Sequence, residues 1–272
     1  MENVAVNTCD SLIGKIDLKI GNRQSTISNE FAFSGIQSAM RFLALATDYD
    51  GTLATHGRVD GIVLPALDRL RASGRKLLLV TGRELHDLQN AFPEAALFDR
   101  IVAENGALLF RPSSNQEIAL CGPPDPRLLA ALRGREVPYS TGRAIVATDD
   151  AHHAAVASAI HELNLALDVH IILNKGSLMI LPTGVDKKTG LEAALAELQL
   201  APANVVGIGD AENDASMLAA CGCAAAVANA LPQIKRNAAL VTASAHGAGV
   251  AELIGQLLDN DLGRYALRHT RG

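Results

Sequence analysis

The chain has 272 residues, of which 49% are hydrophobic and 19% charged, and its formal net charge is −5. This composition is typical of a globular protein and excludes a disordered, collagen-like or disulfide-rich chain. The charge is mildly acidic and Lys and Arg are dispersed along the chain, so we expect no nucleic-acid partner.

Residues 1–39 show no sustained period of two or 3.6, and we interpret them as an N-terminal extension. Glu2 and Asp10 lie where a signal peptide would carry positive charge and an apolar run, so we expect a cytoplasmic protein. The longest apolar stretch, Met217 to Ala228, is shorter than the roughly 20 residues that span a bilayer, so no membrane association is expected.

From Met40 onward, short and continuously apolar runs alternate with amphipathic helical patterns. The expected strands are Phe42–Thr47, Lys76–Thr81, Arg100–Ala103, Val205–Ile208 and Ala224–Ala228. The expected helices are Leu64–Arg71, Leu85–Ala91, Lys187–Leu198, Ala215–Ala220 and Val250–Leu258. Continuous hydrophobicity indicates strands covered on both faces, as in a parallel sheet. The alternation predicts an α/β fold, a doubly wound Rossmann-like core over residues 40–111 and 184–262, followed by a tail over 263–272.

This rhythm breaks over residues 112–183, where several prolines interrupt the chain. The patterns predict helices near Leu128–Arg133 and Ala151–Leu165, and strands near Ala144–Thr148, Val169–Leu173 and Leu178–Leu181. The segment Asn174-Lys175-Gly176-Ser177 links the last two strands and is typical of a β-hairpin turn. We therefore predict a small inserted α+β cap at residues 112–183.

Carboxylates follow two of the expected core strands. Asp48 and Asp50 follow the first strand, and Asp210 and Asp214 follow the strand that begins at Val205. Ligands bind at the carboxyl ends of strands in open α/β sheets. Acids that face one site there favour a bound cation or a shared proton, and carboxylate oxygens with few His nearby suit Mg²⁺ better than Zn²⁺. Taken singly, each pair is equally typical of an acidic turn or a helix cap.

One further segment carries groups that suit a phosphate, and another carries a lysine with no obvious stabilising role. The strand that ends at Thr81 is followed by Gly82, Arg83 and a helix, so it offers a hydroxyl and backbone N–H groups to a phosphate oxygen. Simple capping of the helix by Thr81 is the alternative. Lys187 begins another expected helix, where a cation opposes the helix dipole, and Lys188 is equally available from composition.

Together these segments resemble the motifs of the haloacid dehalogenase (HAD) superfamily of phosphotransferases. The matching stretches, in family order, are Asp48-Tyr49-Asp50-Gly51-Thr52-Leu53, Val80-Thr81-Gly82-Arg83, Gly184-Val185-Asp186-Lys187 and Gly209-Asp210-Ala211-Glu212-Asn213-Asp214. The position of the insert resembles the Cof-like (IIB) branch, whose cap lies between the second and third motifs. The resemblance covers Met40 to about Asp259, and it implies a Mg²⁺-dependent phosphatase that acts on a small phosphorylated metabolite, with a sugar phosphate expected.

The resemblance also implies a role for each acidic residue. Asp48 would be the nucleophile that forms an aspartyl-phosphate, and Asp50 would be the general acid and base. Mg²⁺ would bind the Asp48 carboxylate, the backbone carbonyl of Asp50, and Asp210, with Asp214 bound directly or through a further group.

For the phosphate group, the resemblance implies that Thr81, Lys187 and Asn213 hold its oxygens. Arg83 and Asn105 are candidate contacts to the substrate or to the cap. Two alternatives remain: a phosphomannomutase-like enzyme, which returns the phosphate to a sugar hydroxyl, and a HAD-like scaffold that binds without catalysis.

Overall fold

The computed structural model describes residues 40–265. The predicted extension at 1–39 and most of the predicted tail, 266–272, lie outside the described residues. Within the described range, an eight-stranded sheet has the order β14-β13-β12-β1-β4-β5-β6-β7. Its strands are β1 (Ala44–Thr47), β4 (Lys76–Val80), β5 (Arg100–Ala103), β6 (Leu108–Arg111), β7 (Gln116–Ala119), β12 (Val205–Gly209), β13 (Cys223–Ala226) and β14 (Leu240–Val241).

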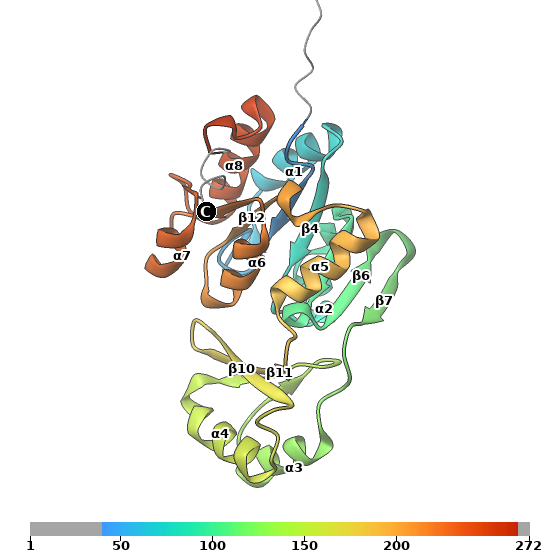
Figure 1. Cartoon of the computed structure of the whole chain (residues 1–272), viewed down its shortest axis with the longest axis vertical. Coiled ribbons are helices and arrows are strands. Elements are labelled where there is room, and N and C mark those ends of the chain that lie inside the picture. The colour runs from blue at the N-terminus through green and yellow to red at the C-terminus, as the bar shows by residue number, and fades with distance from the viewer. Residues whose placement is uncertain (1–39, 266–272) are drawn as a thin grey trace, which may run out of the picture. The chain divides into compact units, whose positions relative to one another are not determined.

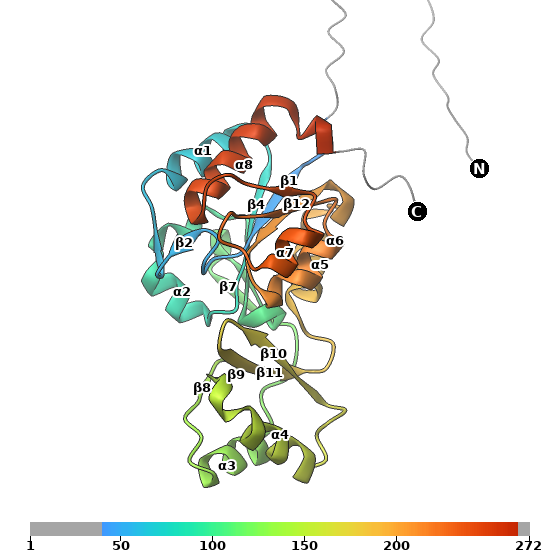
Figure 2. The same ribbon diagram turned by 90° about the vertical axis from the view of Figure 1, so that its left-hand side faces the viewer.

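The pairs from β14 to β5 are parallel, and the pairs β5–β6 and β6–β7 are antiparallel. The predicted α/β core with a mostly parallel sheet is therefore confirmed. Its helices are α1 (Val63–Ala72), α2 (Leu85–Ala91), α5 (Lys187–Leu198), α6 (Ala215–Ala220), α7 (Pro232–Asn237) and α8 (His246–Asn260). Figure 2 shows α1 and α8 on one face of the sheet and α5 and α6 on the other. None of the helices between residues 40 and 265 is long and apolar enough to cross a membrane.

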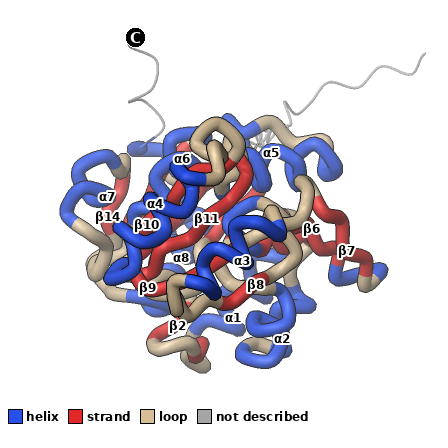
Figure 3. The backbone as a smooth tube through the Cα atoms, turned by 90° about the horizontal axis from the view of Figure 1, so that it is seen from below, coloured by secondary structure: helices blue, strands red, loops and turns tan. Residues whose placement is uncertain are grey.

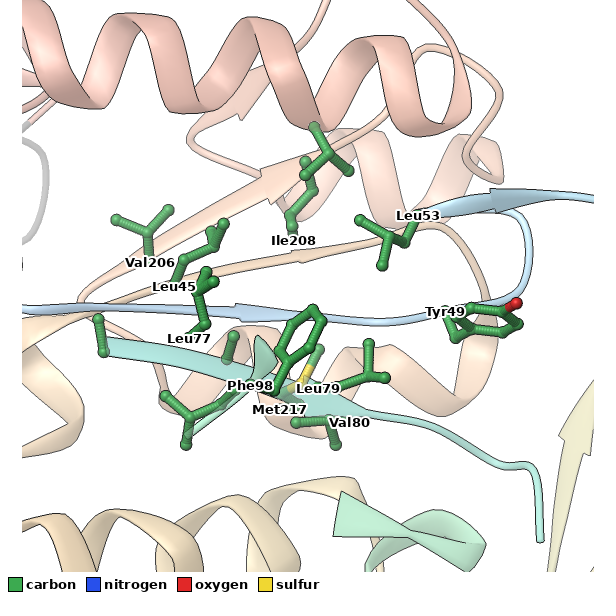
Figure 4. Close-up of a cluster of buried hydrophobic side chains, with 14 of the residues drawn as sticks. Leu45, Tyr49, Leu53, Leu77, Leu79, Val80, Phe98, Val206, Ile208 and Met217 are labelled. Carbon is green, nitrogen blue, oxygen red and sulfur yellow. The ribbon is translucent and has the colours of Figure 1, made fainter. Parts of the chain in front are cut away.

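The centre of the core is the apolar surface of β1 and its two neighbours. Leu45 of β1 is paired in register with Val206 of β12 and Leu77 of β4, and all three side chains are fully buried (Figure 4). Each such side chain stabilises the fold by about 1.5–3 kcal/mol on burial. Because β1, β4 and β12 run parallel, their carboxyl ends meet at one edge of the sheet, which Figure 1 shows facing the cap.

The cap is a four-stranded antiparallel sheet with helices on one face. Its strands, in the order β10-β11-β9-β8, are β8 (Ser140–Thr141), β9 (Val146–Asp149), β10 (Val169–Asn174) and β11 (Ser177–Pro182). Its helices are α3 (Pro126–Gly134) and α4 (His153–Glu162), whose apolar residues form a separate small core with the sheet. Figures 1 and 3 show the cap sheet between these helices and the core.

The first boundary of the cap differs from the predicted one. Residues 116–119, placed by the sequence in the cap of 112–183, form β7 and pair with β6 in the core sheet. The polar turn at 112–115, which follows Arg111 and interrupts the hydrophobic pattern, is the turn of a hairpin. β7 is an edge strand with mostly exposed side chains, so its pattern lacks the continuous hydrophobicity of the inner strands.

A buried carboxylate joins the cap to the core. Glu104, in the short 3₁₀ turn Glu104–Gly106 after β5, is 2% exposed. Its carboxylate accepts backbone N–H groups from Arg143 (2.9 Å), Ala144 (2.9 Å) and Ile145 (3.2 Å) of the cap. Three donors on one carboxylate satisfy its buried charge, so this contact fixes the β8–β9 loop against the core.

We expect Gly106→Ala to lower the free energy of unfolding by about 2–4 kcal/mol. Gly106 has φ +108°, and a Cβ added there would lie 1.9 Å from the backbone oxygen of Asp186, the residue that caps the N-terminus of α5. Urea unfolding of Gly106→Ala and of the control Gly255→Ala measures the difference. Gly255 lies inside α8 with nothing within 4 Å of an added Cβ, so its change should stabilise by up to about 1 kcal/mol. Equal stability of the two variants would contradict this account.

Candidate active site

The loop after β1 and the end of β12 approach each other closely at the edge of the sheet. Gly51 has φ +83°, and a Cβ at this position would lie 2.2 Å from Oδ2 of Asp210. Only a glycine therefore allows the loop that carries Asp48 and Asp50 to lie against Asp210. The backbone oxygen of Gly51 accepts a hydrogen bond from Asn229 Nδ2 at 2.8 Å, which fixes the loop from the opposite side.

This approach brings together the carboxylates of Asp48, Asp210 and Asp214. All three are buried, and one oxygen from each lies within 4.8 Å of the others. Asp214 Oδ2 accepts the backbone N–H groups of Asp210 (2.8 Å) and Ala211 (3.0 Å). The Thr52 hydroxyl donates to Asp210 Oδ1 at 3.2 Å. The donor set consists of hard carboxylate oxygens held in fixed orientations, which fits a divalent cation such as Mg²⁺.

Lys187 inserts its ammonium group into this cluster. Its side chain is fully buried and donates to Asp48 Oδ1 at 2.5 Å and to Asp214 Oδ1 at 2.6 Å. The helix α5 begins at Lys187 because Asp186 and Thr189 form a capping box, with the Thr189 N–H 2.9 Å from Asp186 Oδ1. The neighbouring Lys188 is exposed and pairs with Glu192 on the helix surface. Of the two lysines that composition left open, Lys187 is thus the one that lies in the acidic cluster.

The burial of several charges shifts their pKa values. Burial, together with the charge of Asp214, raises the pKa of Asp48 to about 8, although Lys187 acts in the opposite direction. Burial also raises the pKa of Asp210. Burial lowers the pKa of Lys187, but Asp214 and Asp48 outweigh it and the net shift is upward. Burial and the neighbouring carboxylates thus disfavour the charged forms of Asp48 and Asp210, an effect that a bound cation would oppose.

Asp50 lies at the exposed side of the loop and is held by Arg83. The Arg83 guanidinium donates from Nε to Asp50 Oδ2 at 2.6 Å and from Nη2 to Oδ1 at 2.8 Å. Arg83 also pairs with Asp87 of α2 at 2.7 Å. This bidentate contact sets the orientation of the Asp50 carboxylate. The Asp50 side chain is not one of the three clustered carboxylates. This agrees with the expectation that Asp50 would contact a metal through its backbone carbonyl and not through its side chain.

The remaining predicted residues lie around the same edge of the sheet. Thr81 follows β4, is buried, and its hydroxyl oxygen accepts the backbone N–H of Arg83 at 3.1 Å. Asn213 lies in the short turn Glu212–Asp214, and its Nδ2 donates to Asn105 Oδ1 at 3.0 Å. Asn105 Nδ2 in turn lies 2.8 Å from the sulfur of Met179 in the cap strand β11. Asn105 thus contacts both the core and the cap.

Sequence reasoning missed three contributors to this site. Thr52 lay inside a quoted motif but received no role, and it contacts Asp210. His246, at the start of α8, has its Nδ1 2.9 Å from the oxygen of Gly51, far away in the sequence. Lys175, in the turn between β10 and β11, forms an ion pair with Asp210. The hairpin was predicted, but nothing in the sequence indicated that its turn would reach the acidic cluster.

A cavity of about 420 Å³ lies within the cap, and another of about 410 Å³ lies between cap and core beside Arg83. The second is lined by Gly82, Arg83, Glu84 and Asp87 of the core and by Ser140, Ile145 and Ala147 of the cap. Arg83, which lines this second cavity, is also the residue that holds Asp50. Its volume is that of a site for a small molecule.

Comparison with known proteins identifies relatives over most of the described chain. The family model of haloacid dehalogenase-like hydrolases matches residues 45–122 and 140–254. Phosphoglycolate phosphatase 2 of Saccharolobus solfataricus is 29% identical over 233 residues, covering 82% of this chain and 95% of that protein. The phosphoglycolate phosphatase of Methanothermobacter thermautotrophicus is 31% identical over 222 residues, covering 78% of this chain and 96% of that protein.

Solved structures show the same fold. A haloacid dehalogenase-like hydrolase from Bacteroides thetaiotaomicron aligns with a TM-score of 0.69 at 21% identity, covering 79% of this chain and 99% of that one. A sugar phosphatase of HAD subclass IIB aligns with a TM-score of 0.65 at 18% identity, covering 79% and 98%. The predicted resemblance to the haloacid dehalogenase superfamily is therefore confirmed by the family model, and these structures share the fold of the chain.

In EDTA, which keeps the site free of metal, we expect Asp48→Asn to be stabilised relative to wild type by an amount that grows as pH rises. The cause is the raised pKa of Asp48. The pKa of Asp48 is about 8 in the folded protein against an ordinary value of 3.8. The folded protein thus binds this proton more tightly than the unfolded chain does, and wild-type stability falls as pH rises between those values. The amide of the variant does not titrate.

Melting temperatures of both proteins between about pH 5 and pH 8.5 test this sign, and we expect a change of several degrees in their difference. Asp68→Asn, which removes an exposed carboxylate of α1, is the matched control and should show a constant difference. A difference for Asp48→Asn that does not vary with pH would contradict the raised pKa.

Proposed function

The chain belongs to the haloacid dehalogenase-like hydrolase family, and we propose that it is a Mg²⁺-dependent phosphatase that hydrolyses a small phosphate monoester through an aspartyl-phosphate. One observation carries this proposal. The buried Asp48 carboxylate, at the carboxyl end of β1, lies beside Asp210 and Asp214 and is held by the ammonium group of Lys187. A nucleophile, a cation site and a fixed positive charge are thus within reach of one phosphate group.

In the first step an Asp48 oxygen attacks phosphorus, and the bond from phosphorus to the leaving oxygen breaks. Asp50 donates a proton to that oxygen, and the alcohol departs. Asp50 then takes a proton from water, whose oxygen attacks the aspartyl-phosphate, releases inorganic phosphate and restores Asp48. Mg²⁺ held by Asp48, Asp210 and Asp214 would reduce the repulsion between the carboxylate and the anionic phosphate.

The other predicted residues hold the group that is transferred. Thr81, Lys187 and Asn213 would donate hydrogen bonds to the phosphate oxygens, and these bonds stabilise charge in the transition state. Arg83 orients Asp50 through two hydrogen bonds and also lines the cavity between cap and core. Asn105 links Asn213 to the cap and would keep the phosphate site and the cap in register.

The substrate is a small metabolite, because the cavity between cap and core has a volume of about 410 Å³. The sequence predicts a sugar phosphate, and one structural neighbour is a sugar phosphatase. The two relatives compared by sequence above are phosphoglycolate phosphatases. Both classes are phosphate monoesters, and the chemistry proposed for Asp48 and Asp50 is the same for either.

We expect Asp48→Asn to lower kcat at least about a thousandfold, because an amide is a poor nucleophile and a weaker ligand for a cation. The side chains are nearly isosteric, so the fold should persist, as circular dichroism would show. Phosphate release from a panel of phosphorylated metabolites measures the change. The control is again Asp68→Asn, which should keep wild-type activity. A loss of less than about tenfold for Asp48→Asn would remove Asp48 from the reaction.

We also expect the best substrate to yield one inorganic phosphate for each dephosphorylated product. Activity should vanish in EDTA and return with Mg²⁺, because the buried carboxylates need a cation to accept an anionic substrate. Product analysis by ³¹P NMR distinguishes the alternatives. An isomeric phosphosugar with little free phosphate would favour the mutase, and the absence of any turnover would favour the binding scaffold.

A further inference from the structure

Lys175 lies at the tip of the cap hairpin formed by β10 and β11. The strands pair as far as Asn174 and Ser177, and the two residues between them have positive φ values, +46° for Lys175 and +92° for Gly176. This tight turn is typical of a two-residue hairpin connection. Strand β10 contacts the turn Glu212–Asp214 of the core, so the hairpin directs its tip at the acidic cluster.

The Lys175 ammonium group reaches two parts of the candidate active site. It forms an ion pair with Asp210, and it lies 3.1 Å from the position of a Cβ built on Gly51. Other cationic side chains of the cap have ion pairs away from the cluster: Arg127 with Asp125, Arg135 with Glu162, and Arg143 with Glu117. Lys175 is thus a positive charge that the cap itself brings to the catalytic loop.

Lys175 and Lys187 are held very differently. Lys187 is fully buried between Asp48 and Asp214, whereas the Lys175 side chain is 39% exposed and has its ion pair with Asp210. A second cation on Asp210 would repel an ammonium group in contact with the same carboxylate. The flexible Lys175 side chain can then turn to another anion nearby, whereas Lys187 cannot.

In an in-line displacement the leaving oxygen lies opposite the attacking oxygen of Asp48. Asp48 follows β1 at the edge of the core sheet, and Figure 1 shows this edge facing the cap. A leaving group directed toward the cap would lie on the side from which Lys175 approaches Asp210. A negative charge on the leaving group would pair with Lys175, whereas neutral hydroxyl groups would leave the ammonium group without its anion.

We propose that Lys175 binds a carboxylate on the leaving group, so that the enzyme selects phosphorylated 2-hydroxy acids over phosphosugars. This inference rests on the proposed phosphatase function. It assigns to the hairpin turn a specificity that the catalytic residues of the core do not provide. No bond to Lys175 is made or broken, and its role is electrostatic and positional.

The test compares two substrates of equal size, phosphoglycolate and 2-hydroxyethyl phosphate, which differ in the charge of the leaving group. We expect the wild-type enzyme to prefer phosphoglycolate at least about 30-fold in kcat/KM, and Lys175→Gln to lose most of this preference. The variant should change less than about threefold on 2-hydroxyethyl phosphate. Lys175→Arg, which keeps the charge, should retain a large part of the preference, and the cap control Arg127→Gln should match wild type on both substrates.

Binding supplies a readout that does not depend on turnover. Calorimetry with 3-phosphonopropionate and 3-hydroxypropylphosphonate, which cannot be hydrolysed, should show that Lys175→Gln weakens binding of the carboxylate compound alone. Mg²⁺ titration without substrate should show affinity for Lys175→Gln that equals or exceeds wild type, because the cation no longer displaces an ammonium group from Asp210.

The outcomes separate this inference from the phosphatase function. Equal losses on the charged and neutral compounds, or a wild-type preference for phosphosugars, would overturn the role of Lys175 while the enzyme remained a phosphatase. If the wild type hydrolyses no phosphate ester, the phosphatase function fails. The selective loss of phosphonate binding in Lys175→Gln would then still support the carboxylate site, and an unselective loss would reject it.

Discussion

The repulsion among Asp48, Asp210 and Asp214 is the constraint on which the rest of the site depends. Three buried carboxylates within 4.8 Å of one another are stable only with positive charge and hydrogen-bond donors close by. The core provides these through the buried Lys187 and through the backbone N–H groups that point at Asp214. The capping box that starts α5 therefore serves the site as well as the helix, because it fixes where Lys187 enters.

Two of the core carboxylates that contact the cap have opposite properties. Glu104 accepts three backbone N–H groups and is almost fully buried, so it is a permanent attachment. Asp210 forms an ion pair with the partly exposed Lys175 of the hairpin turn. The β8–β9 loop is thus attached through a buried carboxylate, whereas the hairpin tip is attached through an ammonium group that solvent reaches.

The sequence predicted the parts of the fold whose hydrophobic pattern is strong. The helices α2, α5 and α6 have the predicted limits, and the inner strands agree within a few residues. The edge strands β7 and β14 were missed because a short strand with an exposed face lacks a continuous apolar run. The strand β6 was also missed, although Leu108, Leu109 and Phe110 are apolar and buried. The helix α7 was also missed, because Ile234 is its one buried side chain and no apolar face recurs along it.

For the site, the sequence identified which residues follow which strands but not how they pair. Asp48 and Lys187 are 139 positions apart, and their contact depends on the parallel register of β1, β4 and β12 and on the entry of α5. The Arg83–Asp50 pair depends in the same way on the spacing of β1 and β4. Such contacts follow from the packed sheet, which local patterns in the sequence do not specify.

The division between core and cap explains how the substrate could change while the chemistry stays the same. The groups proposed to act on phosphorus follow the ends of core strands or begin α5, where a change in one carboxylate disturbs the charge balance of the others. Lys175 lies instead in a hairpin turn, and it is not one of the residues that pair between β10 and β11. A different residue there would leave the ladder and the buried carboxylates in place and would change the charge that meets the leaving group. Selectivity located at such a turn is separable from catalysis, because the two depend on different parts of the fold.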